Sequence, residues 1–132
     1  MGKFKAQGTA AELRWIRKFK AAGLDAKSQR DSGNPDADGD LEVTAYVVRA
    51  TETDVWEDDW RIVGEIRDRQ KMNVVAAMQR AVKRSGTHRT FIGWTKRLEL
   101  PAGRTRRTTE GEVVVIPTEF FLELLGGSNG PG

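Results

Sequence analysis

The stretch from residue 41 to residue 67 most constrains the fold, because two β-type runs flank a polar, acidic segment. The run 41–49 is rich in Val, Thr and Tyr, and the run 60–67 alternates side chains at the period of two that a strand requires. The segment 51–59 between them is expected to form the tip of a long hairpin. In the second run one face is expected to carry Trp60, Ile62, Gly64 and Ile66, and the other Arg61, Val63, Glu65 and Arg67.

Helical patterns surround this hairpin. Thr9-x-x-Glu12 has the form of a capping box, and the apolar spacing that follows it predicts a helix over 9–22, ended by Gly23. Similar spacing predicts a helix over 71–84, and Pro117 opens a third over 118–125. Shorter β-type runs occupy 24–29, 88–94 and 112–116. The order α, β, β, β, α, β, β, α predicts one α/β domain over 1–125, a mixed β-sheet flanked by helices, with 126–132 as a flexible Gly-rich tail.

Composition limits the chemistry that this chain can perform. The 132 residues include no cysteine, which excludes thiolate metal sites and cysteine nucleophiles. The single histidine, His88, cannot build a His-rich zinc site, so any metal must be held by oxygen atoms. No apolar stretch approaches the roughly 20 residues of a membrane span, and the N-terminus lacks a secretory apolar core. We therefore expect a soluble cytoplasmic protein with no membrane partner, in the host cytoplasm if a phage encodes it.

Charge is segregated along the chain. Residues 1–35 carry eight basic against three acidic residues, 36–68 carry three against eleven, 69–109 carry eleven against one, and 110–132 carry none against four. Basic segments around an acidic centre suit a protein that binds a polyanion such as DNA around a cation site. Charges that mix in space on a solvated surface would produce the same segment totals.

Three aspartates at alternate positions, Asp36, Asp38 and Asp40, precede the first hairpin run. Their spacing matches the start of an EF-hand loop, but the positions that need Gly and a bidentate Glu are filled by Leu41 and Val47. A surface turn explains the first two aspartates, because the preceding Ser, Gly, Asn and Pro are turn residues. Asp40 stands where the turn ends and the strand begins, which suggests a further role.

Glu65 and Arg67 lie two residues apart on the returning strand, so their side chains leave the same face. Pairing of the two strands would bring Asp40 within reach of Glu65. Two carboxylates there would supply the all-oxygen surroundings that Mg²⁺ prefers. Such a site could polarise a phosphodiester and lower the pKa of a bound water.

This arrangement of Asp40 followed by Glu65-Ile-Arg67 on a strand resembles the PD-(D/E)XK nuclease core, and within it the archaeal-type Holliday junction resolvases, also found in phages. The resemblance extends over about residues 7–125 and includes Gly8-x-x-x-Glu12, the Ser32-Gly33 loop and the helix after the E-x-K position. It implies a restriction-endonuclease-like fold and a magnesium site, with Mn²⁺ able to substitute. It also implies that Asp40, Glu65 and Glu12 bind metal and that these three residues and Arg67 are catalytic.

Two departures from the family pattern stand out. Arg67 replaces the family's lysine, and arginine keeps the charge and can clamp phosphate but does not readily lose a proton. Lys71 is a candidate to supply an ammonium in its place. The hairpin between Asp40 and Glu65 is also longer than the archaeal members lead us to expect.

Simpler explanations exist for each residue. Glu12 is accounted for by the capping box, Asp40 by a turn, and Glu65 with Arg67 by an ion pair. Three tryptophans, Trp15, Trp60 and Trp94, are expected in the core, whereas Trp56 at the acidic tip suggests contact with another chain or with DNA.

The function that we expect is a magnesium-dependent, structure-selective DNA endonuclease that resolves four-way junctions in recombination or replication, acting as a two-fold homodimer. DNA contacts are expected from Arg67 and the basic surface of residues 71–84, and from Arg30, Ser32, Lys71, Arg104, Arg106 and Arg107. Dimer contacts are expected from Val55 and Trp56 and from Phe120, Phe121, Leu124 and Leu125, with core packing as the alternative for Phe120 and Leu124. The alternatives are another nuclease of the same fold that acts in repair, and a non-catalytic basic DNA-binding domain that uses the 104–107 loop.

Overall fold

The computed structural model describes residues 2–29, 39–98 and 109–126 as one small α/β domain. Its elements are α1 (Gly2–Ala21), β1 (Asp25–Ser28), β2 (Leu41–Ala50), β3 (Val55–Arg69), α3 (Val74–Ser85), β4 (Arg89–Arg97), β5 (Thr109–Val115) and α4 (Thr118–Leu124). The strands form a five-stranded sheet in the order β1-β2-β3-β4-β5. Only β3 and β4 pair in parallel, across the crossover through α3, so the sheet is mixed as expected.

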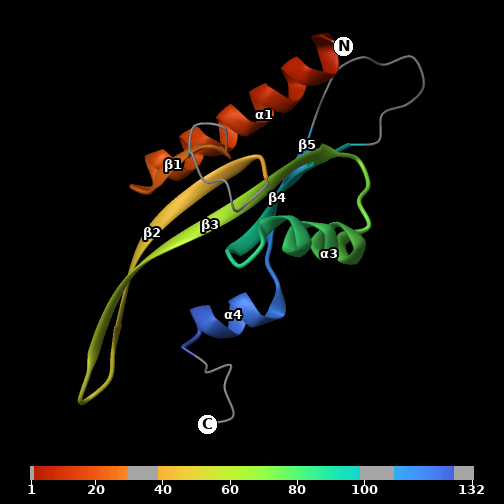
Figure 1. Cartoon of the computed structure of the whole chain (residues 1–132). Coiled ribbons are helices and arrows are strands. Elements are labelled where there is room, and N and C mark those ends of the chain that lie inside the picture. The colour runs from red at the N-terminus through yellow and green to blue at the C-terminus, as the bar shows by residue number, and fades with distance from the viewer. Residues whose placement is uncertain (1, 30–38, 99–108, 127–132) are drawn as a thin grey trace.

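The two faces of the sheet are covered by different helices (Figure 1). On one face α1 buries Trp15 and Ile16 against a core that includes Leu41, Ile66 and Phe91. On the other face α3 packs Ala77 and Ala81 against Ile92, with Met72, Met78, Trp94 and Val115 around them. Because side chains alternate along a strand, the neighbours of Leu41 and Ile66, namely Asp40, Glu65 and Arg67, belong to the face that carries α3.

The first helix is longer than the sequence predicts. It begins at Gly2 rather than at Thr9, so Thr9 lies inside α1 and the expected capping box does not open it. The preceding Lys, Ala and Gln residues are good helix formers, which explains the extension. Glu12 therefore loses its capping explanation. None of the helices in residues 2–29, 39–98 and 109–126 is long and apolar enough to cross a membrane.

The second predicted helix begins later than expected, at Val74 rather than Lys71. The Asn73 side chain accepts a hydrogen bond from the backbone N–H of Ala76 at 3.1 Å, which caps the helix. Gly86 follows its end at φ 66°, as the sequence predicts. Lys71 consequently lies in the connection before α3 and not on the helix.

The hairpin has a much shorter tip and a longer ribbon than predicted. Thr51 and Asp54 close the turn, where the Thr51 N–H donates to the Asp54 carbonyl at 2.8 Å. Residues 55–59, expected in the tip, instead pair with 46–50 as regular strand. Their acidic side chains are exposed on the ribbon, so their charge does not oppose strand formation.

This ribbon extends as an arm beyond the rest of the sheet (Figure 1). β1 pairs with β2 only as far as Thr44, and β4 pairs with β3 only from Ile62. Residues 45–60, here called the arm, therefore form two strands, and no other strand of the described residues pairs with either edge. Isolated two-stranded ribbons are marginally stable in water. Packing at the base of the arm is thus needed to hold it.

The last helix supplies part of that packing. Phe120 of α4 is buried and meets the Trp60 ring edge-on, with centroids 5.8 Å apart. Glu123 accepts two hydrogen bonds from Arg89, at 2.6 and 2.7 Å, and this interaction lowers the pKa of the Glu123 carboxyl. The Arg89 guanidinium also lies 3.9 Å from the Trp60 ring centroid. Core packing is therefore the correct prediction for Phe120, whereas Leu124 is exposed.

Gly64 is the position where β3 comes closest to the core side chains below it. A Cβ built on Gly64 would overlap the ring of Phe91, which is buried between the sheet and α1. The carbonyl of Gly64 also accepts the N–H of Asp40 at 2.9 Å. A residue without a side chain is therefore required where β3 passes Asp40.

Gly64→Ala is expected to lower the free energy of unfolding by about 1–3 kcal/mol, because the new methyl group overfills the space taken by Phe91. Urea unfolding measures this change. Phe91→Leu removes part of the ring and provides the matched test. The double variant should be less destabilised than the two single changes added together, and strict additivity would contradict the proposed clash.

Candidate active site

Asp40 and Glu65 lie directly opposite each other on neighbouring strands. Leu41 pairs with Gly64 in the antiparallel ladder, which places the preceding and following residues, Asp40 and Glu65, side by side on the face that carries α3. The Asp40 carbonyl also accepts the N–H of Gln29, so its backbone is held from both sides. The strand register therefore places both side chains on one face, and their role as a shared metal site stays a prediction.

Arg67 bridges the two carboxylates. Its Nη1 donates to Asp40 Oδ2 at 3.3 Å and to the Ile66 carbonyl at 3.0 Å, while its Nη2 donates to Glu65 Oε2 at 2.5 Å. Asp40 Oδ2 also accepts the backbone N–H of Ile66 at 2.7 Å. Because these contacts hold a side chain that is only 18% exposed, Arg67 is fixed in place.

A second arginine reaches Glu65 from α3. The Glu65 side chain is 2% exposed, and its Oε1 lies 2.9 Å from Nη1 of Arg84 in an ion pair that does not have the geometry of a hydrogen bond. A carboxylate removed from water in this way requires compensation by cations or donors. Glu65 is therefore flanked by Arg67 on one oxygen and Arg84 on the other.

Glu42 adds a buried carboxylate to the same face. It lies two residues beyond Asp40, is 1% exposed, and accepts a hydrogen bond on Oε1 from Arg61 Nε at 2.5 Å. Its Oε2 is buried and makes no hydrogen bond to the described residues. The sequence spacing alone could have identified Glu42, because residues 40 and 42 lie on the same face of any strand.

Sequence reasoning missed Glu42, and although it placed Arg84 on a phosphate-binding surface, it missed the contact of Arg84 with Glu65. For Arg84 the sequence holds no local signal, because its contact with Glu65 depends on how α3 docks on the sheet. The strand ladder and the helix register together place three acidic and three arginine side chains on one face: Asp40, Glu42, Glu65, Arg61, Arg67 and Arg84.

Glu12 is not gathered with Asp40 and Glu65. It is half-buried on α1, close to Ala11 and Ile16, and α1 covers the opposite face of the sheet. In residues 2–29, 39–98 and 109–126, no three Asp, Glu or His side chains are positioned together to hold a metal. The assignment of Glu12 as a third metal ligand and catalytic residue stays a prediction.

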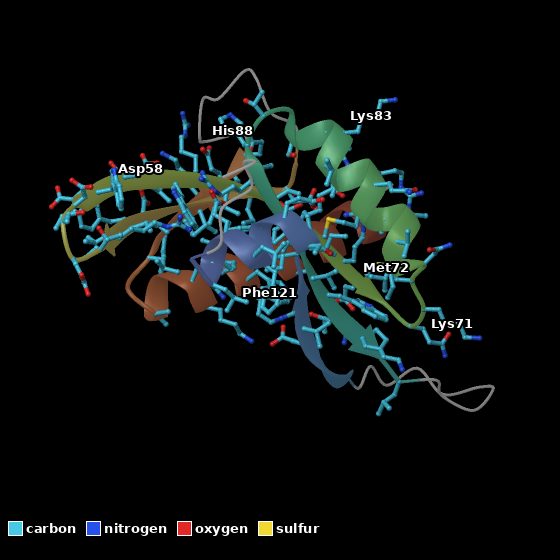
Figure 2. The ribbon with its side chains drawn as sticks, turned by 90° about the horizontal axis from the view of Figure 1, so that it is seen from below. Asp58, Lys71, Met72, Lys83, His88 and Phe121 are labelled. Atoms are coloured by element: carbon cyan, nitrogen blue, oxygen red, sulfur yellow. The ribbon has the colours of Figure 1, made fainter. Side chains whose placement is uncertain are left out.

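Most residues that were individually predicted to contact DNA lie outside the described residues. Lys71 is exposed in the connection before α3 (Figure 2). Arg84 lies in the last turn of α3, and it is Arg84 that pairs with Glu65. Arg30, Ser32, Arg104, Arg106 and Arg107 lie outside the described residues, as do Asp36 and Asp38.

The carboxylate pair fits a hard divalent cation in its donor chemistry. Both candidate ligands are oxygens, and neither Asp40 Oδ1 nor Glu65 Oε1 is used by Arg67. Mg²⁺ is commonly held by one or two carboxylates, with water and substrate phosphate completing its shell. Two carboxylates are therefore sufficient, provided that the Arg84 guanidinium can leave Glu65.

Comparison with known proteins finds no matching family model, no matching curated protein and no matching solved structure. The resemblance to the PD-(D/E)XK nucleases therefore stands on the quoted residues alone, and the restriction-endonuclease-like assignment stays a prediction.

Arg67→Ala is expected to lower the free energy of unfolding by about 2–4 kcal/mol, because it leaves the buried Glu65 with a single cation. Urea denaturation measures the loss. Arg69→Ala removes an exposed charge two residues further along β3 and should cost less than about 0.5 kcal/mol. Adding Glu65→Gln to Arg67→Ala should restore part of the loss. Equal effects of Arg67→Ala and Arg69→Ala would contradict a stabilising bridge.

Proposed function

We propose that this protein is a divalent-metal-dependent, structure-selective DNA endonuclease of the Holliday junction resolvase type. The observation that carries the proposal is the direct opposition of Asp40 and Glu65 across β2 and β3, with Arg67 on the same face. Paired carboxylates beside arginines suit a reaction in which a cation and a phosphate meet at one site.

The residues would have distinct roles in phosphodiester hydrolysis. A divalent ion on Asp40 and Glu65 would polarise the phosphodiester and lower the pKa of a bound water. Arg67 keeps Asp40 oriented and offers positive charge to the phosphate. It is not a general base, because a guanidinium does not lose its proton in this pH range.

DNA would approach over the surface of α3. Arg80, Lys83 and Arg84 are exposed on this helix, and Figure 2 shows Lys83 extending away from the ribbon. Contacts of this kind bind the phosphate backbone without reading bases. They therefore suit a nuclease that recognises the shape of branched DNA.

The second candidate function is a non-catalytic DNA-binding domain. It is favoured by the ion pairs themselves, because Arg67 and Arg84 already compensate Glu65 without a metal. In that case the cluster is structural, and the basic surface alone binds DNA.

An assay with Mg²⁺ or Mn²⁺ on duplex, flap, Y-shaped and four-way DNA separates these functions. Preferential cleavage of the four-way junction supports the resolvase, and preferential cleavage of another DNA supports a different nuclease of the same fold. Salt-dependent binding without cleavage of any of the four supports the DNA-binding domain.

Asp40→Asn and Glu65→Gln are each expected to reduce cleavage at least about a hundredfold while DNA affinity is kept or increased. Each change removes a metal ligand and also removes negative charge that repels phosphate. Cleavage rates and fluorescence anisotropy with labelled DNA provide the two measurements. Asp25→Asn, an exposed acid on β1, is the matched control and should cleave normally. Full activity in Asp40→Asn would refute the proposed site.

The proposed dimer contact lies next to the arm. Trp56 on the arm is 53% exposed, and Phe121, Leu122 and Leu124 of α4 and the following Leu125 are exposed as well. Arg49 pairs with Trp56 across the ribbon and donates to the Glu123 carbonyl, which places α4 beside the arm. Apolar side chains on both elements would form one patch suited to a two-fold contact.

Light scattering at micromolar concentration is expected to give about twice the 14.7 kDa chain mass. Trp56→Ala combined with Leu125→Ala should shift the mass towards that of one chain, because both side chains belong to the patch. Val48→Ala serves as the control, since Val48 is equally exposed on the opposite face of the arm. A wild-type monomer that still nicks DNA would favour a general nuclease over a resolvase.

A further inference from the structure

The two arginines on Glu65 differ in their exposure and in the element that carries them. Arg67 contacts Asp40, Glu65 and a backbone carbonyl and is 18% exposed. Arg84 reaches Glu65 from the last turn of α3, and its side chain is 40% exposed. An exposed arginine on a helix surface can change rotamer without disturbing the strand, whereas Arg67 cannot leave without breaking several hydrogen bonds.

The arginines also use different carboxylate oxygens. Arg67 binds Glu65 Oε2 and Asp40 Oδ2, whereas Arg84 lies on Glu65 Oε1. Departure of Arg84 alone would therefore expose Glu65 Oε1 beside Asp40 while the Arg67 bridge stays intact. The two groups would then offer one oxygen each to a cation.

The formal charges of the cluster explain why replacement of Arg84 by a cation requires a phosphate group as a second ligand. Asp40 and Glu65 carry two negative charges, and Arg67 and Arg84 carry two positive charges, so the cluster is neutral. A divalent cation added to it would meet two guanidinium groups at close range, and like charges oppose each other. A phosphate group that accepts Arg84 removes this opposition.

We propose that Arg84 is a phosphate-binding residue that occupies Glu65 in the free protein and transfers to a phosphodiester of DNA when a divalent cation takes its place. The inference rests on the proposed function and adds a regulation to it, namely that cation and DNA bind cooperatively. In the free protein, Arg84 leaves Glu65 open in only a minor fraction of the molecules, and only these molecules bind the cation. The apparent cation affinity is therefore reduced by that fraction. Free protein is thereby kept from loading metal in the absence of DNA.

Two binding measurements test this inference without cleavage. The first is the Mn²⁺ affinity of DNA-free protein, measured by electron paramagnetic resonance of free Mn²⁺. The second is the affinity for a labelled four-way DNA, measured by anisotropy with and without Ca²⁺ at constant ionic strength. In the wild type Ca²⁺ should tighten DNA binding about tenfold or more, since coupling between two ligands is reciprocal. Arg84→Gln should raise the Mn²⁺ affinity about tenfold without DNA and reduce the Ca²⁺ effect on DNA to less than about threefold.

Two controls isolate the role of Arg84. Arg80→Gln removes the same charge from the preceding turn of α3 and should weaken DNA binding while the tightening by Ca²⁺ persists. Asp40→Asn should abolish the Ca²⁺ effect, which places the cation at the carboxylate pair. Thermal unfolding of each variant verifies that the fold is retained.

The outcomes separate the inference from the proposed function. If Asp40→Asn abolishes cation binding but Arg84→Gln behaves as wild type in both measurements, the inference is overturned and the nuclease proposal stands. If neither Mn²⁺ nor Ca²⁺ acts on the wild type and no DNA is cleaved, the proposed function fails and the inference fails with it.

Discussion

A buried carboxylate dictates the arrangement around it. Glu65 is 2% exposed in the middle of the sheet, and a charge in that position must be compensated. Arg67 provides one cation from the same strand, which also contacts Asp40, the residue directly before β2. Arg84 provides the other from α3, so the docking of α3 and the registry of β2 with β3 meet at this one side chain. A group retained at such cost in a small domain is a candidate for function rather than stability.

One face of the sheet carries the larger apolar core, and the other carries the charged cluster. Under α1 the side chains are mainly apolar, with Leu41, Ile66 and Phe91 forming the larger core. On the face of α3 the apolar contact with Ile92 occupies one side, and the charged cluster occupies the strands beside it. Glu12, on the first helix, belongs to the apolar side. The separation allows rearrangement of the charged groups while the core stays packed.

The arm and α4 form the other distinctive part of the molecule. A ribbon with open edges and exposed Trp56 has little to stabilise it beyond its base, where Trp60, Phe120 and Arg89 pack together. Its acidic side chains repel phosphate, so the arm itself is a poor DNA contact. In the proposed dimer the arm would serve as a protein contact.

The sequence by itself determined the alternation of β3, the order of the elements and the pairing of Asp40 with Glu65, because period-two patterns and adjacent strands fix which side chains share a face. It also determined that the first helix exists, but its start at Thr9 was wrong, since a capping motif competes with helix-forming residues before it. The extent of the ribbon was also mispredicted, because acidic residues on an exposed strand look like a loop in sequence. Only the tertiary structure decided that Arg84 and not Lys71 lies on Glu65, that Glu42 is buried, and that Glu12 lies across the sheet. The place of Arg84 depends on how α3 docks on the sheet, which is decided by the packing of Ala77 and Ala81 on Ile92 and not by local spacing.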